Sequence, residues 1–419
     1  MIPLDKTVFV ILIALLYLSP LEAKKTDPAL KQDPDSSLLR FGGFLQMQGV
    51  FSQDRSIDPI MDNNKRWSSQ LQIWRARIML GGNISPKTSF FMQTEIPSPI
   101  GFVDTEKHIQ DISPIILDAN IEHKFSDNFM VITGMQLVGI NRQGLQSPVT
   151  LMGLDFGWYQ YPYNLFQSQA LQNNFGRDIG INTRGFVLDE RLEWRLGVFR
   201  GRTTGTNSSF RYVFRLNYNF FEKDKGLYYT GTNLGKQKLF SIGGGIDTQD
   251  NYISGALDAF LDLPTNNGAF TWQGSYMYLD GGASESLSSF TPFIPNQSIF
   301  FTELGYFFKK VKIQPYIKYE AQMIDISKKQ YTVNQERLNP SSPLSSLSDT
   351  PSDNNLHYFN TLTSQSRVGT GINYFVNDYN FHIKLQYEQI FYGRFGTSDE
   401  PETKSSGELK LQLTYFIFK

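Results

Sequence analysis

The sequence predicts an all-β protein: a transmembrane antiparallel β-barrel of about 16 strands, with short periplasmic turns and long external loops. The first observation is that segments of about ten residues, in which apolar and polar side chains alternate, recur along the chain. The second is that no long window shows the period of an amphipathic helix. The third is the composition, with 34 Phe, 21 Tyr and 34 Gly against 19% charged residues, since aromatics favour strands and membrane interfaces.

Length, hydropathy and charge exclude several other classes. The 419 residues exceed the roughly 250–300 residues at which single soluble cores stop growing, a limit that a barrel does not share. A mean hydropathy of −0.31 excludes a bundle of membrane helices. The net charge of −1 argues against nucleic acid as a partner. Without cysteine, a disulfide scaffold, a thiolate metal site and an N-terminal lipid anchor are also excluded.

The N-terminus is predicted to be a signal peptide, residues 1–23. Lys6 supplies its basic region, Val8–Leu18 its apolar run and Leu21–Ala23 a cleavage site. The apolar run is shorter than the roughly 20 residues that span a bilayer, although an uncleaved anchor is the alternative. Residues 24–39 are polar and contain two prolines, and we expect a disordered periplasmic lead-in before a barrel of residues 40–419.

The first eight strands are predicted where alternation is clearest. In the second, Trp74 and Ile78 fall on the apolar face, and Arg75 and Arg77 on the polar face. The eighth has aromatic or aliphatic residues at every second position, and Arg211, Arg215, Asn217 and Asn219 face the other way. The predicted ranges are Arg40–Gln53, Leu71–Gly82, Thr88–Glu95, Ile115–Phe125, Phe129–Leu137, Arg177–Phe186, Leu192–Phe199 and Phe210–Phe220.

The last eight strands follow the same rule, and the final one must pair with the first to close the barrel. Phe418 falls on the polar phase of that strand, so either a bulge shifts its register or the offset is tolerated. The predicted ranges are Leu239–Asp247, Tyr252–Leu263, Ala269–Tyr278, Ile299–Phe308, Val311–Gln322, Gln365–Phe375, Tyr379–Gln389 and Glu408–Phe418.

Short and long connections alternate, which places the short ones at the periplasmic end and the long ones outside. The longest is residues 323–364, rich in Ser, Pro and Asn, and we expect it to be external. The eighth connection, Phe221–Lys238, is long for a periplasmic turn. We expect part of it to extend the flanking strands.

The inward face of the predicted strands carries charges of both signs in nearly equal numbers. Because charge at this density cannot be buried dry, we expect a water-filled lumen. Arg211 and Arg215 could form part of an anion path, or could pair with carboxylates of the next strand. The candidate pore-lining residues are Arg75, Arg77, Lys124, Arg195, Arg211, Arg215, Lys318, Arg367, Lys384, Asp118, Glu122 and Glu320.

The order of several motifs resembles the phosphate-selective porin O and P family. This resemblance implies a sixteen-stranded homotrimeric barrel in the outer membrane. The motifs are Trp74–Gly82 with Phe90 and Gln93, Arg177–Ile181, Leu192–Gly201, Gly231–Lys236, Gln314–Glu320 and Gly369–Phe375.

The segment Val138–Gly176 corresponds to the inward-folded loop of that family, and we interpret it as a candidate constriction. The alternative is an external loop that packs on itself or on a neighbouring subunit. In the phosphate-specific members anion selectivity resembles a ladder of arginines plus lysines on this loop, whereas here it has one arginine, no lysine and many aromatics. We therefore do not expect phosphate specificity. The candidate constriction residues are Arg142, Asp155, Trp158 and Tyr161.

Together these observations favour an outer-membrane channel for passive diffusion of small hydrophilic solutes and ions. The alternative function is a binding or adhesion barrel whose long loops contact a ligand. The four scattered histidines share no ligand spacing, and no serine nucleophile marks a catalytic site, so we expect neither a metal, nor a cofactor, nor enzyme activity. Expected partners are outer-membrane lipids, two further copies in a homotrimer, the barrel-assembly machinery and the permeating solutes.

Overall fold

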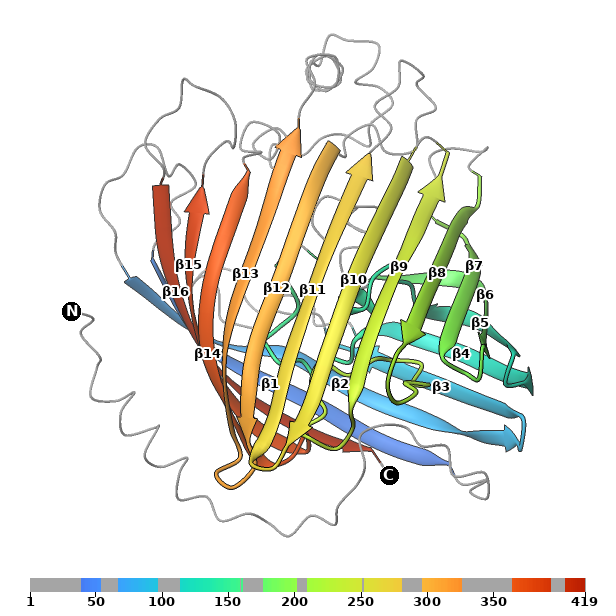
Figure 1. Cartoon of the computed structure of the whole chain (residues 1–419), viewed down its shortest axis with the longest axis horizontal. Helices are drawn as coiled ribbons and strands as arrows, with labels where there is room; N and C mark the ends of the chain where they lie inside the picture. Colours follow the sequence, from blue (N-terminus) through green and yellow to red (C-terminus); the bar gives the residue numbers. More distant parts are fainter. Residues whose placement is uncertain are drawn as a thin grey trace.

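The structure, a computed structural model, confirms the predicted barrel. Sixteen antiparallel strands form one sheet in sequence order, closed by pairing of the first strand with the last (Figure 1). It describes residues 39–53, 67–96, 114–158, 160, 176–201, 209–250, 252–280, 296–325, 364–392 and 404–418. The predicted signal peptide, nearly all of the lead-in and most of the 323–364 loop lie outside the described residues.

The strand boundaries agree with the predicted ranges to within about four residues at each end. In the first half the strands are β1 (Arg40–Gln53), β2 (Trp67–Ser85), β3 (Thr88–Glu95), β4 (Ile115–Ser126), β5 (Phe129–Leu137), β6 (Arg177–Val187), β7 (Leu192–Phe199) and β8 (Arg211–Asn219). In the second half they are β9 (Leu239–Gln249), β10 (Tyr252–Thr265), β11 (Gly268–Asp280), β12 (Asn296–Phe308), β13 (Ile313–Asp325), β14 (Gln365–Asn377), β15 (Phe381–Tyr392) and β16 (Lys404–Phe418).

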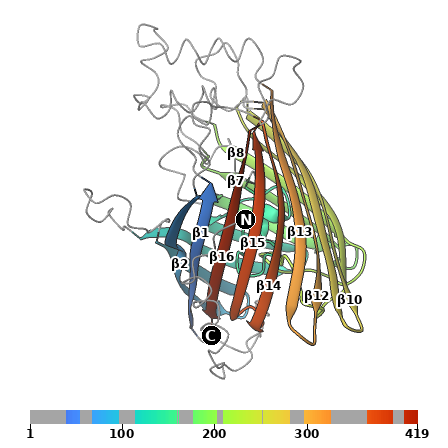
Figure 2. The ribbon, with the colours of Figure 1, turned by 90° about the vertical axis from the view of Figure 1, so that its left-hand side faces the viewer.

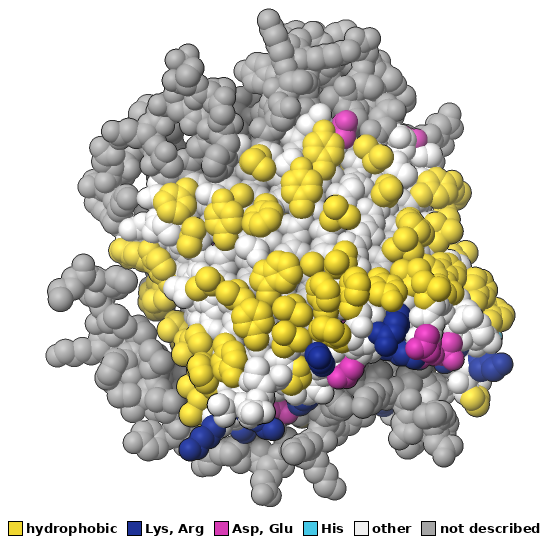
Figure 3. Space-filling model, viewed as in Figure 1, with side chains coloured by type: hydrophobic (Ala, Val, Ile, Leu, Met, Phe, Trp, Pro, Cys, Tyr) yellow, Lys and Arg dark blue, Asp and Glu magenta, His cyan; other side chains and the backbone are white. Residues whose placement is uncertain are grey.

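Side chains alternate across the barrel wall as predicted. Outward positions such as Leu216, Ile246 and Leu257 are exposed and apolar, whereas inward positions such as Arg215 and Asp258 are buried and polar. Apolar side chains gather over the outer face of the strands in front, β9–β14, and charged ones at the lower, short-turn end (Figure 3). The described part of the chain contains no helix long and apolar enough to cross a membrane.

The closing strand answers the question raised by Phe418. β16 pairs with β1 without a register shift from Ser52↔Glu408 to Gly42↔Phe418, and the two strands lie side by side in Figure 2. No bulge therefore brings Phe418 to the outer face. Its ring packs edge-on against Phe91 of β3, with ring centres 6.2 Å apart, among the aromatics at the short-turn end.

A bulge in β2 corrects the predicted position of Trp74. The pairing of β1 with β2 passes from Gln46↔Arg75 to Met47↔Ile73 and omits Trp74. A bulge leaves one residue unpaired and redirects its side chain. Trp74 therefore points into the lumen, where its indole N–H donates to Asp155, although alternation placed it on the outer face.

The inner face is not polar throughout, which is a second correction. At the short-turn end, Phe44, Met79, Phe307, Phe375 and neighbouring residues form an apolar cluster, which we call the lower cluster. Nearer the long-connection end, an upper cluster contains inward side chains of β7, β8 and β10 to β12. Each cluster also contains residues from connecting segments, which are therefore packed inside the barrel. The upper cluster comprises Val138, Ile140, Phe199, Val213, Tyr252, Ala256, Met277, Leu279 and Ile299.

Candidate functional site

The connection after β5 enters the lumen from the long-connection end, and we call its residues 138–158 the upper segment. Val138 and Ile140 begin it within the upper cluster. Arg215 of β8 donates to the Ile140 carbonyl oxygen at 2.8 Å. Both apolar burial and a charge-assisted hydrogen bond therefore fix its start against the inner wall.

The middle of the upper segment is held by the opposite wall. Val149 packs in the lower cluster, and the Lys384 ammonium of β15 donates to the carbonyl oxygens of Leu151 and Gly153 at 2.5 and 2.8 Å. Gln412 of β16 donates to the Leu154 carbonyl oxygen at 3.2 Å. The segment therefore crosses the lumen from β8 to β15 and β16.

Asp155 anchors the last part of the upper segment to β2. Its two carboxylate oxygens accept from Arg75 at 2.8 and 3.1 Å, and Trp74 also donates to it. Burial alone would raise the pKa of this loop carboxyl, but the Arg75 charge and the donated hydrogen bonds outweigh burial and lower it. Trp158, which is 48% exposed, lies under the Arg367 guanidinium at 4.1 Å from the ring centre.

The eighth connection, residues 220–238, also enters the lumen, but from the short-turn end; we call it the lower segment. Its ends extend the β8–β9 ladder as expected, through Phe220 N–H to Phe240 O at 2.8 Å and Glu222 N–H to Lys238 O at 3.1 Å. Between these ends the chain turns inward. Tyr229 pairs with Gln146 of the upper segment in an isolated parallel bridge. The predicted strand extension is therefore confirmed for the ends of the connection, and its middle has a different conformation.

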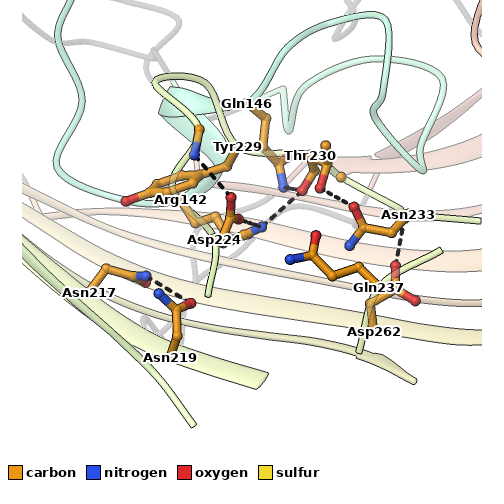
Figure 4. Close-up of polar contacts among 12 residues, drawn as sticks. Arg142, Gln146, Asn217, Asn219, Asp224, Tyr229, Thr230, Asn233, Gln237 and Asp262 are labelled. Carbon is orange, nitrogen blue, oxygen red and sulfur yellow. Dashed lines mark hydrogen bonds and ion pairs between the residues drawn. The ribbon is translucent and has the colours of Figure 1, made fainter. Parts of the chain in front are cut away.

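Tyr229 and Arg142 join the two segments to the wall (Figure 4). Arg142 donates to Asp224 at 2.9 Å and to the Thr230 carbonyl oxygen at 3.2 Å. The Tyr229 hydroxyl donates to Glu193 of β7 at 2.5 Å. The guanidiniums of Arg142, Arg195 and Arg215 lie 4.6, 5.1 and 5.6 Å from the Tyr229 ring centre, as in cation–π contacts.

Most inward charges of β6 to β10 are paired with one another; Arg177 instead bonds Asp118 of β4, and Asp262 accepts from the Asn233 N–H. Arg211 bonds Asp247 of the next strand at 2.6 Å and Asp178 at 3.2 Å, and Arg215 bonds Asp258 at 2.6 Å. Glu193 forms ion pairs with both Arg195 and Arg184, at 2.9 and 3.0 Å. Of the two interpretations of Arg211 and Arg215, the structure therefore shows carboxylate pairing. Burial and pairing, and not hydration alone, accommodate these charges.

A cavity of about 220 Å³ remains beside the upper segment, on the side of β1, β2 and β13 to β16. Five cationic and two anionic side chains line it. Every one of these cations has a carboxylate partner, but the partners of Arg77, Arg177 and Lys410 are not among the lining residues; these partners are Glu95, Asp118 and Glu408. The charged lining residues are Arg75, Arg77, Arg177, Lys318, Lys410, Asp155 and Glu388, and the uncharged ones are Gln48, Trp74, Gln146, Pro148, Leu154, Phe156, Gly157, Trp158 and Gln386.

The predicted site residues fall into four groups. Arg75, Arg77, Lys318, Asp155 and Trp158 line the cavity. A second group consists of lumen residues that do not line the cavity and that contact the segments or a partner of opposite charge: Arg142, Arg195, Arg211, Arg215, Arg367, Lys384, Asp118 and Glu320. Lys124 and Glu122 stand near the short-turn rim, where Lys124 bonds Asp127 at 2.6 Å. Tyr161 lies outside the described residues.

Sequence reasoning did not assign Trp74 or Tyr229 to the lumen. For Trp74 the available signal was its position directly before Arg75 and Arg77. A bulge at such a position can turn the aromatic side chain to the same face as the arginines. For Tyr229 the signal was the unusual length of the eighth connection. Among the described residues, no three histidine or carboxylate side chains gather as metal ligands would.

Comparison with known proteins supports the fold alone. The sequence matches no family model and no curated protein. OprB of Pseudomonas putida is similar in structure with a TM-score of 0.57 and 9% identity, covering 90% of this chain and 94% of that one. The outer-membrane channel DcaP of Acinetobacter baumannii gives 0.52 and 10%, covering 90% and 97%. The anion-selective porin from Comamonas acidovorans gives 0.51 and 8%, covering 91% and 99%.

Proposed function

We propose that this protein is an outer-membrane porin that admits small hydrophilic solutes and ions by passive diffusion. The observation that carries the proposal is the closed sixteen-strand barrel with a constricted lumen and a polar, cation-rich cavity. Similarity in fold to outer-membrane channels supports it. Export with signal-peptide cleavage and assembly as a homotrimer belong to the same proposal.

A weak preference for anions follows from the cavity lining. Rings of one sign set ion selectivity in pores, and here cations exceed anions by five to two. Pairing limits the effect, because Arg75 faces Asp155 across 2.8 Å and Lys318 faces Glu388 across 2.9 Å. Such partly neutralised cations favour chloride over potassium without selecting phosphate, so no phosphate specificity is proposed.

Planar-bilayer recording of the refolded protein tests the channel. We expect stepwise conductance. In a KCl gradient we expect a reversal potential whose sign shows that chloride permeates more easily than potassium. Lys410, whose side chain is 15% exposed beside Glu408, lines the cavity. Lys410→Gln should shift the reversal potential toward the value for cation preference. Lys223→Gln, which changes a lysine of the lower segment away from the cavity, is the matched control and should leave the reversal potential unchanged. Absence of channel steps would contradict the proposal and favour the alternative, a binding or adhesion barrel.

A further inference from the structure

The lower segment lies where a simple barrel needs only a tight turn. Two to four residues connect the other described strands at this end, whereas 19 connect β8 to β9. Asn219 N–H bonds the Arg191 carbonyl oxygen of the β6–β7 turn at 2.8 Å, which places the start of the segment at the short-turn end. The additional residues lie inside the barrel.

The lower segment reaches the far wall. Thr232 accepts from Gln314 of β13 at 3.2 Å, and its carbonyl oxygen accepts from the Tyr379 hydroxyl of the β14–β15 turn. The Asn233 N–H donates to Asp262 of β10 at 2.6 Å. Lys236 bonds Asp378 at 3.0 Å. The segment thus extends across the lumen from β8 and β9 to β13, β14 and β15.

Apolar packing fixes the lower segment in this position. Leu234 is 6% exposed and packs in the lower cluster, which also contains Val149 of the upper segment. Burial of this apolar side chain stabilises the packed position of the segment. Gly231 lies so close to the upper segment that a Cβ there would be 2.7 Å from the Leu151 Cα, so the two backbones are in direct contact. Contacts of this density indicate a stationary element.

We propose that the lower segment is a second, fixed constriction element, which limits solute size at the short-turn exit of the channel. The two segments enter from opposite ends and are joined by the Gln146–Tyr229 bridge and the Arg142–Asp224 ion pair (Figure 4). The proposal rests on the proposed porin function.

Excision of the segment tests its role. Glu222 and Lys238 form a backbone pair, so residues 223–237 can be replaced by Asn-Gly, the pair preferred in two-residue hairpins. Conductance should then rise by about twofold or more, because a sixteen-strand barrel without inner segments has a wide aqueous lumen. Polyethylene glycols excluded from the short-turn side of the wild-type channel should enter the variant. The variant Ser85→Ala removes only exposed hydrogen bonds of the β2–β3 turn, at the same end but outside the segment, and should conduct like the wild type.

A reversible crosslink tests whether the element is fixed. Because the chain contains no cysteine, Lys236→Cys and Asp378→Cys introduce the only thiols, which a reducible bifunctional thiol reagent can join. Conductance should be unchanged by crosslinking and by its reduction. A fall that reduction reverses would overturn the proposal, because it would show a segment that must move during conduction.

Failure of this inference is distinguishable from failure of the proposed function. If the wild type forms no channels, the porin proposal itself fails. If the wild type conducts and the excised variant, shown to be a β-barrel by circular dichroism and heat-modifiable migration, conducts equally, only the second constriction is refuted. If the excised variant does not fold, the crosslinked protein still decides between a fixed element and a moving one.

Discussion

The two halves of the inner wall use the same residue types differently. On the covered wall, which we define as the inner face of β6 to β10 apart from Arg177, the upper and lower segments contact Arg184, Arg195 and Arg215. Each of these arginines, like Arg211, bonds a carboxylate. Arg177, at the start of β6, lines the cavity instead. On the cavity wall, formed by β1, β2 and β13 to β16, lysines and arginines border open space. An inward arginine is therefore either packed beneath the segments or open to the cavity, according to what covers it.

The largest effect is expected where a covered pair is broken. Arg215 and Asp258 have side chains only 1% and 2% exposed, joined at 2.6 Å. Removal of one partner leaves an uncompensated buried charge, so Arg215→Ala should lower the free energy of unfolding by about 3–5 kcal/mol. Urea unfolding in detergent, followed by tryptophan fluorescence, measures this change.

The double variant Arg215→Met, Asp258→Leu is the control for that prediction. It removes both charges and fills the space with apolar atoms, so it should be much less destabilised than Arg215→Ala. The reversal potential of the double variant should equal that of the wild type, because neither residue lines the cavity. A clear shift of the reversal potential toward cation preference would show that Arg215 acts on permeating ions. It would contradict the division into a covered wall and a cavity wall.

The sequence predicted the fold well because membrane burial imposes one simple rule on every strand. Alternation identified all sixteen strands, and closure followed from the need to pair every backbone group in lipid. Turn residues located most boundaries. The inward phase of Arg75, Asp118, Arg215 and Glu320 was also correct, since a register error by one residue would have placed these charges on the apolar outer face.

The interior was less predictable because lumen packing follows no period. Phe44, Phe307 and Phe375 occupy inward positions near short turns, where they build an apolar floor for Leu234. Taken singly, each is only an exception to alternation. Which arginine is covered and which borders the cavity depends on two connections that cross the barrel, and contacts between distant segments cannot be deduced from local patterns.

Asp155→Asn sharpens the comparison on the cavity wall, with an intermediate effect. It removes the ion pair with Arg75. A hydrogen bond to a charged group contributes about 1.5–3 kcal/mol, but Asp155 is 20% exposed and water partly screens its charge. We therefore expect the free energy of unfolding to fall by about 1–2 kcal/mol. The cavity also loses one of two negative charges, and the reversal potential should move toward anions. A stability loss without that shift would contradict the assignment of Asp155 to the ion path.

The pH dependence of this variant has a definite sign. Because the folded pKa of Asp155 lies below its ordinary value, its ion pair contributes stability above the unfolded pKa of about 3.9 and loses it as pH falls through the lower folded value. The selectivity difference between wild type and Asp155→Asn should therefore persist from neutral pH to about pH 4. It should vanish only in stronger acid. Its disappearance at pH 5 to 6 would contradict the strong Arg75–Asp155 pair.

The smallest effect is expected outside both walls, at the short-turn rim. Glu190 accepts from Lys225 at 2.5 Å and from Lys223 at 3.1 Å, and these hydrogen bonds, first that of Lys225, lower its pKa. Lys225→Ala should raise the pKa of Glu190 toward its ordinary value, an effect that carbon-13 NMR of labelled glutamate can follow. Exposed pairs are screened by water and salt, so unfolding and conductance should stay at wild-type values. A change in conductance comparable to that of Asp155→Asn would show that charges at the rim, and not only those of the cavity wall, act on passing ions.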